Sequence, residues 1–284
     1  MIRGEGDGGN TGRRGHRGGK AETQSDSPGS GRKQQRSAKQ AEPAEAGIAD
    51  PAPDVAAPTP PQPQHRPART VRILSCGAKG GPGKTFLCKN LAGAAAAAGY
   101  SVAVVDFDTQ RTLTKWLRRR EQHSPDKPLI EGFAADPRSL EDAQAVIDLN
   151  SYEVILYDTP PAIDQHPEVL KALAYAADLI LVPSAVGISD TESAEVLLSV
   201  LREWRRPTLA ILNKVKRNAH KTIGIAKKRL LRMADLAPVE VGEYYDFLVS
   251  DEVGQGATEM DSCVGQDDIT ALWTIVARRA GLED

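Results

Sequence analysis

The sequence has few of the residues that build covalently linked or metal-stabilised folds. Its 284 residues include three cysteines, Cys76, Cys88 and Cys263, and no two of them form a C-x-x-C pair. This distribution indicates a reduced chain without structural zinc or an iron–sulfur cluster. No apolar run approaches the roughly 18 residues of a membrane span, and the N-terminus has no apolar core of the signal-peptide type. We therefore expect a cytoplasmic protein, and we do not expect a membrane among its partners.

Large apolar residues are scarce over residues 1–69, where Gly, Ser, Gln, Arg and Pro dominate. Such a stretch cannot bury enough apolar area to offset the entropy that it would lose on ordering. We expect a disordered tail over 1–69 and one folded domain over 70–284. The tail has 11 Lys/Arg against 8 Asp/Glu, so it is either a weak nucleic-acid tether or a solvated linker.

From residue 70 onward, strand-like apolar runs alternate with helical patterns. The expected strands are 71–76, 100–105, 129–134, 154–157, 179–183 and 209–213, and the expected helices are 84–98, 112–121, 138–149, 167–176, 190–204 and 219–233. Apolar residues at helical spacing over 269–280 predict a further helix that packs on the core. This alternation predicts an α/β fold, a parallel sheet with helices on both faces, whose ligands lie beyond the carboxyl ends of the strands.

A glycine-rich stretch, the phosphate-binding loop (P-loop, residues 78–85), joins the first strand to the first helix. Backbone N–H groups of such a turn can converge on phosphate oxygens, and the helix N-terminus adds the positive end of its dipole. Lys84 would contact the β- and γ-phosphates, and the Thr85 hydroxyl would hold Mg²⁺. The generic motif has glycine at position 78, where this chain has Ala78 followed by a second lysine, Lys79.

Two further strands end in carboxylates on the same side of the predicted sheet. Asp106 and Asp108 come after the second strand, and Asp158 follows four apolar residues of the fourth. The carboxylate of Asp158 has the position of a Walker B residue, which can accept hydrogen bonds from a metal-bound water and from the Thr85 hydroxyl. These motifs therefore predict a nucleotide site with Mg²⁺.

The pattern K-G-G-P-G-K-T, together with these carboxylates, resembles the deviant Walker A motif of the ParA/MinD family of P-loop ATPases, over about residues 70–280. The resemblance implies ATP and Mg²⁺ as cofactors. It implies that Asp108, 24 residues after Lys84, orients the attacking water. Asp106 would act on Mg²⁺ indirectly, by holding groups that bind the ion. The resemblance also implies that Asn213 contacts the adenine edge, although an asparagine at a strand end is commonly a turn residue. The nucleotide-binding residues that we expect are Gly80, Gly81, Pro82, Gly83, Lys84, Thr85, Phe86 and Asn213, and the metal-binding residues are Thr85, Asp106 and Asp158.

Lys79 has a separate role in this resemblance. In the ParA/MinD family, the equivalent lysine enters the partner's site when two subunits enclose two ATP molecules, as an arginine finger does elsewhere. The resemblance therefore implies Lys79, Lys84 and Asp108 as catalytic residues and a homodimer in the ATP-bound state.

Residues 202–232 contain 11 Lys/Arg and one acidic residue, whereas the rest of the domain is acidic. On the helix expected at 219–233 no aromatic residues interleave with the charges, so base stacking is not indicated. Phosphate contacts alone would give nonspecific, salt-sensitive DNA binding, and the alternative is an ordinary solvated face. The candidate DNA-binding residues are Arg205, Arg206, Lys214, Lys216, Arg217, Lys221, Lys228 and Arg232.

The resemblance implies a ParA-like partition ATPase, associated with the nucleoid, that dimerises on ATP and moves a plasmid or chromosome with a ParB-like adaptor protein. Its hydrolysis of ATP to ADP and phosphate would be slow and partner-stimulated. Three alternatives remain at this stage. The same switch could position conjugation, chemotaxis or division machinery; the protein could be a MinD-like membrane-associated ATPase; or it could be a metabolic ligase or reductase on the same P-loop, similar to dethiobiotin synthetase or the nitrogenase iron protein.

Overall fold

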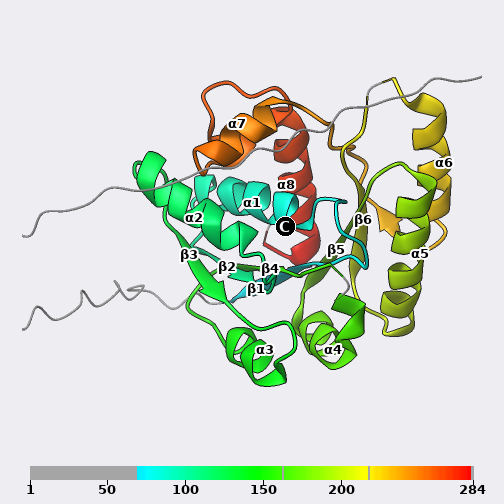
Figure 1. Cartoon of the computed structure of the whole chain (residues 1–284), viewed down its shortest axis with the longest axis horizontal. Coiled ribbons are helices and arrows are strands. Elements are labelled where there is room, and N and C mark those ends of the chain that lie inside the picture. The colour runs from blue at the N-terminus through cyan, green and yellow to red at the C-terminus, as the bar shows by residue number, and fades with distance from the viewer. Residues whose placement is uncertain (1–68, 162, 217, 283–284) are drawn as a thin grey trace, which may run out of the picture. The chain divides into compact units, whose positions relative to one another are not determined.

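The computed structural model describes residues 69–161, 163–216 and 218–282 (Figure 1). The tail expected over 1–69 therefore lies outside the described residues, apart from Arg69. In the described part of the chain, seven strands form one sheet in the order β3-β2-β4-β1-β5-β6-β7, and all neighbouring strands run parallel. The predicted parallel α/β fold is confirmed. The strands are β1 (Val71–Ser75), β2 (Val102–Asp106), β3 (Ile130–Ala134), β4 (Val154–Asp158), β5 (Leu179–Ser184), β6 (Thr208–Leu212) and β7 (Asp235–Leu236).

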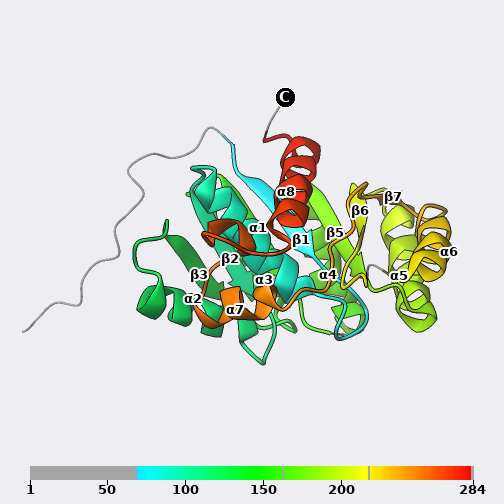
Figure 2. The same cartoon turned by 90° about the horizontal axis from the view of Figure 1, so that it is seen from above.

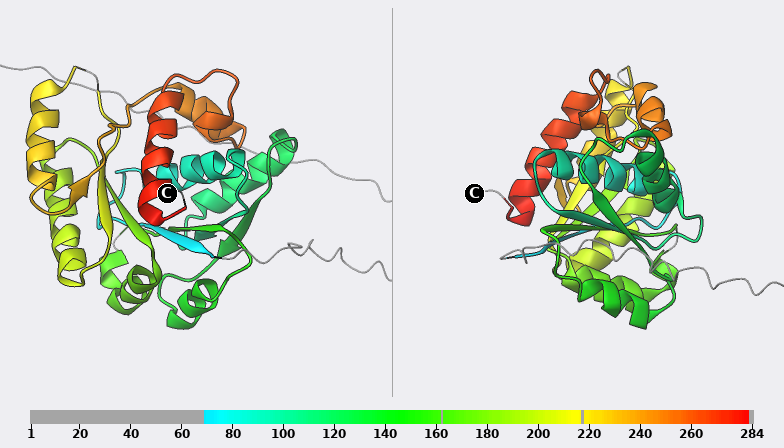
Figure 3. Two further views of the ribbon diagram at one scale, coloured as in Figure 1. Left: turned by 180° about the vertical axis from the view of Figure 1, so that it is seen from behind. Right: turned by 90° about the vertical axis from the view of Figure 1, so that its left-hand side faces the viewer.

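The helices cover both faces of this sheet. Helices α1 (Lys84–Ala97), α2 (Thr112–His123), α7 (Asp246–Glu252) and α8 (Gln266–Ala280) lie on one face, above it in Figure 1. Helices α3 (Leu140–Ile147), α4 (Pro167–Ala176), α5 (Ile188–Glu203) and α6 (His220–Leu230) cover the other face. Short 3₁₀ turns occur at Ile163–Gln165 and Ala257–Glu259. The two layers are clearest where the sheet is seen from its edge (Figure 3).

Alternation within the strands builds two apolar cores, one on each face. In β1, Ile73 packs into the core under α1 and α8, whereas Leu74 packs into the core of α3, α4 and α5, and both side chains are fully buried. Helices α5 and α6 lie against the β6–β7 edge of the sheet (Figure 2). All three cysteines are buried and unpaired. No helix in the described ranges is long and apolar enough to cross a membrane.

The register of the central strands brings the sequence motifs together. Ser75 at the end of β1 lies level with Asp158 at the end of β4, and Asp158 lies level with Asp106 at the end of β2. The P-loop leaves β1 at this edge and enters α1 at Lys84. The carboxyl ends of three adjacent strands therefore form one site.

Candidate functional site

The P-loop turns through two glycines in left-handed backbone conformations. The φ angles of Gly81 and Gly83 are +97° and +107°, a region that glycine adopts without steric cost. A Cβ atom at Gly83 would lie 2.0 Å from Nδ2 of Asn213. Glycine is therefore required at position 83 by the backbone conformation and by the close approach of Asn213.

Lys84, the first residue of α1, lies inside the curve of this loop. Its side chain is nearly buried, and Nζ donates a hydrogen bond to the carbonyl oxygen of Lys79 at 3.1 Å. Burial lowers the pKa of Lys84, and the carboxylate of Asp158 opposes this effect. The ammonium group thus occupies the loop that would enclose phosphate oxygens.

Asp158 is fully buried, and neither of its carboxylate oxygens has a hydrogen-bond partner of good geometry among the described residues, although the Thr85 hydroxyl lies close enough to act on the carboxylate. Burial raises the pKa of Asp158 to about 7, while the Thr85 hydroxyl and Lys84 act in the opposite direction. A buried carboxylate without a partner is costly unless a cation or a donor satisfies it. The oxygen atoms of Asp158 and Thr85 are the ligand type that Mg²⁺ prefers. These residues fit a Mg²⁺ ion with its bound waters.

Asp106 and Asp108 follow the end of β2 but have different contacts. Oδ1 of Asp106 accepts a hydrogen bond from the Asp108 backbone N–H at 3.0 Å. Its Oδ2 accepts from the backbone N–H and the hydroxyl of Thr114, both at 2.9 Å, which fixes the first turn of α2. Asp108 is half-buried, and its Oδ1 accepts from the Gln110 backbone N–H at 2.9 Å. Asp106 therefore holds the loop that carries Asp108.

Lys79 extends away from Lys84, toward the start of α5. Its Nζ lies 3.1 Å from the Ser189 hydroxyl and 2.9 Å from Oδ1 of Asp190, and its side chain is 47% exposed. Sequence reasoning did not identify Asp190 as its partner, since 111 residues separate the two. In this structure the second lysine of the P-loop is held by its own subunit.

A cavity of about 180 Å³ adjoins the P-loop at Phe86. Asn213 lies in its wall, is nearly buried, and donates from Nδ2 to the carbonyl oxygen of Pro82 at 2.8 Å. Three aromatic rings and Leu248 form much of the other walls, together with Lys214 and Glu243, and aromatic walls suit a planar base. The cavity is lined by Phe86, Asn213, Lys214, Gly242, Glu243, Tyr244, Phe247 and Leu248. The residues from 242 onward were not identified from the sequence, because a seven-residue helix gives no clear periodic signal.

The basic residues of 202–232 divide into those with partners and those without. The Arg206 guanidinium donates to the carbonyls of Ala174, Tyr175 and Ala177 at the end of α4, and Lys216 lies 3.8 Å from Glu243. No ion pair joins the other candidates to a carboxylate in the ranges that the structure describes, and Arg217 lies outside those ranges. The unpaired candidates are Arg205, Lys214, Lys221, Lys228 and Arg232.

Comparison with known proteins identifies a nucleotide-binding domain in this chain. The family model "CobQ/CobB/MinD/ParA nucleotide binding domain" matches residues 73–239. The chromosome-partitioning ATPase Soj of Thermus thermophilus is 30% identical over 172 residues, which cover 51% of this chain and 68% of Soj. The matched segments span 52% to 68% of the lengths of the curated relatives, about half in some cases.

Two solved structures share the fold. The septum site-determining protein MinD of Pyrococcus horikoshii, complexed with Mg-ADP, has a TM-score of 0.60 and 20% identity, covering 75% of this chain and 98% of MinD. A structure of pNOB8 ParA bound to nonspecific DNA has a TM-score of 0.50 and 16% identity, covering 76% of this chain and all (100%) of that chain.

Proposed function

This chain belongs to the CobQ/CobB/MinD/ParA family of nucleotide-binding domains, and on that premise we propose that it is a Mg²⁺-dependent ATPase whose ATP-bound form is a dimer. The observation that carries the proposal is the buried carboxylate of Asp158, which makes no hydrogen bond of good geometry among the described residues and lies level with Ser75, at the end of the strand that leads into the P-loop. A Mg²⁺ ion that binds with a nucleotide would supply the positive counterion that this carboxylate lacks. The solved MinD structure is a complex with Mg-ADP.

The steps of hydrolysis are divided among residues of this chain. Lys84 would exchange the Lys79 carbonyl for a phosphate oxygen, and P-loop N–H groups would contact the other oxygens. Thr85 and Asp158 would hold Mg²⁺, which supplies positive charge against the triphosphate when bound. Asp108, on a loop that Asp106 fixes, would orient the attacking water.

Lys79 would act in the partner's site of the dimer. Its present ion pair with Asp190 is half-exposed, and exposed pairs of this kind contribute about 0.2–1 kcal/mol. The γ-phosphate of an ATP bound to the second subunit could therefore replace Asp190 as the partner of the Lys79 ammonium. This exchange would couple ATP binding to dimerisation, and loss of the γ-phosphate on hydrolysis would reverse it.

The partner molecules of the proposed switch are nonspecific DNA and a ParB-like adaptor, in the partitioning of a plasmid or chromosome. The unpaired cations on and near α6 support phosphate contacts that do not depend on sequence. Among the similar proteins, Soj is named a chromosome-partitioning ATPase, and pNOB8 ParA has been solved with nonspecific DNA. A cytoplasmic, nucleoid-associated protein follows from this proposal.

ATP hydrolysis and molar mass in solution test the ATPase and the dimer together. We expect slow hydrolysis that requires Mg²⁺, and a dimer with Mg·ATP but a monomer with Mg·ADP. Asp108→Ala should bind ATP and remain dimeric, because the water is no longer oriented. Lys84→Ala should lose nucleotide binding. Hydrolysis that is unchanged in Lys84→Ala, or a monomer under all conditions, would contradict the proposal.

Charge reversal of Lys221, Lys228 and Arg232 to glutamate tests DNA binding. The variant should lose ATP-dependent retention on DNA, and the dependence of its DNA affinity on salt should flatten. The matched control reverses Lys115 and Arg118, two exposed cations of α2. An unchanged salt dependence in the α6 variant would exclude this surface.

A further inference from the structure

Helix α7 forms one wall of the cavity beside the P-loop, yet little apolar burial holds it there. Of its seven residues, only Phe247 and Ser250 are buried. The Phe247 ring packs against Phe86 of α1, with ring centroids 4.9 Å apart. The matched family segment ends at residue 239, before this helix begins. The position of α7 therefore depends on polar contacts as well as on Phe247.

One turn beyond Phe247, the carboxylate of Asp251 joins three helices. Its Oδ1 lies 2.5 Å from Nζ of Lys89, a residue of α1 that is 8% exposed. Its Oδ2 lies 3.0 Å from Nη2 of Arg119 in α2, and Nε of Arg119 donates to the Asp251 carbonyl at 2.8 Å. Asp251 thus fixes the end of α7 to both helices beside the nucleotide site.

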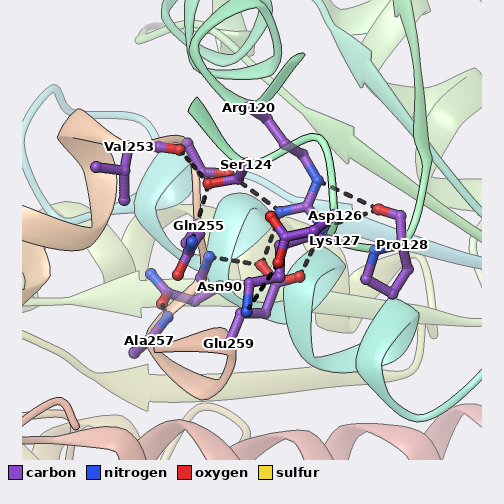
Figure 4. Close-up of polar contacts among 12 residues, drawn as sticks. Asn90, Arg120, Ser124, Asp126, Lys127, Pro128, Val253, Gln255, Ala257 and Glu259 are labelled. Atoms are coloured by element: carbon purple, nitrogen blue, oxygen red, sulfur yellow. Dashed lines mark hydrogen bonds and ion pairs between the residues drawn. The ribbon is translucent and has the colours of Figure 1, made fainter. Parts of the chain in front are cut away.

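The chain that follows α7 is fixed separately, by the buried pair of Arg120 and Glu259 (Figure 4). The two guanidinium nitrogens of Arg120 lie 2.8 Å and 2.6 Å from the Glu259 oxygens, and Nη1 also donates to the Gly254 carbonyl at 3.1 Å. Oδ1 of Asn90 accepts from the Ala257 N–H at 2.8 Å. These bonds hold residues 254–259 independently of Asp251. At the other end of α7, Oδ2 of Asp246 accepts from the Val264 N–H at 2.7 Å, so Asp251 is the polar contact that joins α7 to α1 and α2.

We propose that Asp251 is a positioning residue for the nucleotide base. Through Lys89 and Arg119 it sets where Phe247 and Leu248 lie beside Phe86, and these side chains form part of the wall of the cavity in which a base would stack. Without its charge, the nearly buried ammonium of Lys89 has no counterion, and α7 moves outward as water reaches Lys89. The inference rests on the proposed nucleotide function and identifies the residue that controls its base subsite.

Two probes separate the base subsite from the phosphate subsite: Mg·ATP and Mg·tripolyphosphate, which has no base. In the full chain, we expect Asp251→Asn to weaken Mg·ATP binding about tenfold, since stacking of a base on an aromatic ring contributes about that much. Binding of Mg·tripolyphosphate should change less than about twofold. The control is Glu252→Gln, which removes a neighbouring exposed charge of α7 and should change neither affinity.

A second variant keeps the test valid if Asp251→Asn folds poorly. Adding Lys89→Met removes the unpaired buried charge, so the double variant should regain thermal stability while its affinity for Mg·ATP stays low. Equal weakening of both probes, or recovery of ATP affinity together with stability, would make Asp251 a structural residue only and overturn the inference. Failure of the wild-type protein to bind either probe would overturn the proposed function and this inference with it.

Discussion

Asp158 carries an electrostatic cost in the folded protein. In an unfolded chain its carboxylate is hydrated, whereas in the described structure it is enclosed without a hydrogen-bond partner of good geometry. Because the folded pKa of about 7 lies above the ordinary value of 3.8, the folded state binds the extra proton between these values. The contribution of Asp158 to stability therefore becomes less favourable as pH rises from about 4 to about 7.

Replacing Asp158 by asparagine should stabilise the protein when Mg²⁺ is chelated and no nucleotide is present. We expect a gain of about 1 kcal/mol, or about 2–4 °C in the melting temperature, with a larger gain at pH 8 than at pH 5. Thermal unfolding in a chelator at the two pH values measures this. The same variant should lose Mg²⁺-dependent ATP binding, and a lower melting temperature at pH 8 would argue against a buried charge.

Asp190 competes with any partner for the ammonium of Lys79. Asp190→Asn should therefore form ATP-dependent dimers at a protein concentration about two- to fivefold lower, since it loses an ion pair of about 0.2–1 kcal/mol. Sedimentation over a concentration series measures the shift. Glu203→Gln, at the far end of the same helix, is the control. If Asp190→Asn dimerises like the wild type, Lys79 is not restrained by this contact.

At the scale of secondary-structure elements, the arginines after α5 connect neighbouring helices. Arg205 has a left-handed φ of 54°, at the position after the helix where glycine is usual. Arg206 then extends over the C-terminus of α4, donates to three carbonyls there, and stacks on Tyr175 at 5.1 Å. A cation at the C-terminus of a helix also interacts favourably with the negative end of the helix dipole. Arg206 therefore joins α5 to α4, although the sequence presented it as one more charge for DNA.

Arg206→Ala and Lys228→Ala should separate stability from DNA binding. The first should lower the free energy of unfolding by about 1–3 kcal/mol, because it removes charged hydrogen bonds and a ring contact. The second should leave stability unchanged and lower the salt slope of DNA binding by about one. Urea unfolding and DNA titrations at several salt concentrations check both. A large fall in the salt slope for Arg206→Ala would mean that its guanidinium is free in solution.

Helix α7 should respond to the base rather than to the phosphates. We expect amide hydrogen exchange over residues 246–252 to slow with Mg·ATP and to change little with Mg·tripolyphosphate, since only ATP fills the cavity against Phe247. Exchange in β1 should be slow in all samples because every residue of this strand except Arg72 is buried. Equal protection of α7 by both ligands would mean that phosphate binding at the P-loop, and not the base, restrains this helix.

At the scale of the whole molecule, apolar runs predicted six strands to within two residues. Five of them are buried on both faces and are nearly continuous in apolar side chains, whereas the edge strand β3 is only partly buried. The two-residue strand β7 and the short α7 have no such signal. Lys84, Thr85 and Asp158, which would form the phosphate side of the candidate site, could be selected from the sequence since each lies at a strand end or in a local motif. The cavity walls and the Asp190 contact were not, because they depend on how segments distant in the sequence return to α1 and the P-loop.

Nucleotide should stabilise the entire domain through this one site. At a hundredfold excess over its dissociation constant, Mg·ATP should add about 2.7 kcal/mol, or about 5–10 °C in the melting temperature. Removing Mg²⁺ with a chelator should eliminate most of that gain, since Asp158 again lacks a counterion. Thermal scans with ATP, with and without chelator, test this. The same gain in the absence of Mg²⁺ would separate Asp158 from metal binding.

In the hydrogen bond from Lys84 to the Lys79 carbonyl, an oxygen of the P-loop itself takes the place that a phosphate oxygen would occupy on Lys84. Any phosphate that binds must compete with this internal acceptor, so each measured affinity is the intrinsic affinity multiplied by the fraction of loops that are open. A triphosphate has further contacts with which to win that competition, whereas inorganic phosphate has few. Under the proposed function, the closed loop would keep inorganic phosphate, a product of hydrolysis, from occupying the site. Binding of a triphosphate by Lys84 would in turn release the carbonyl oxygen of Lys79.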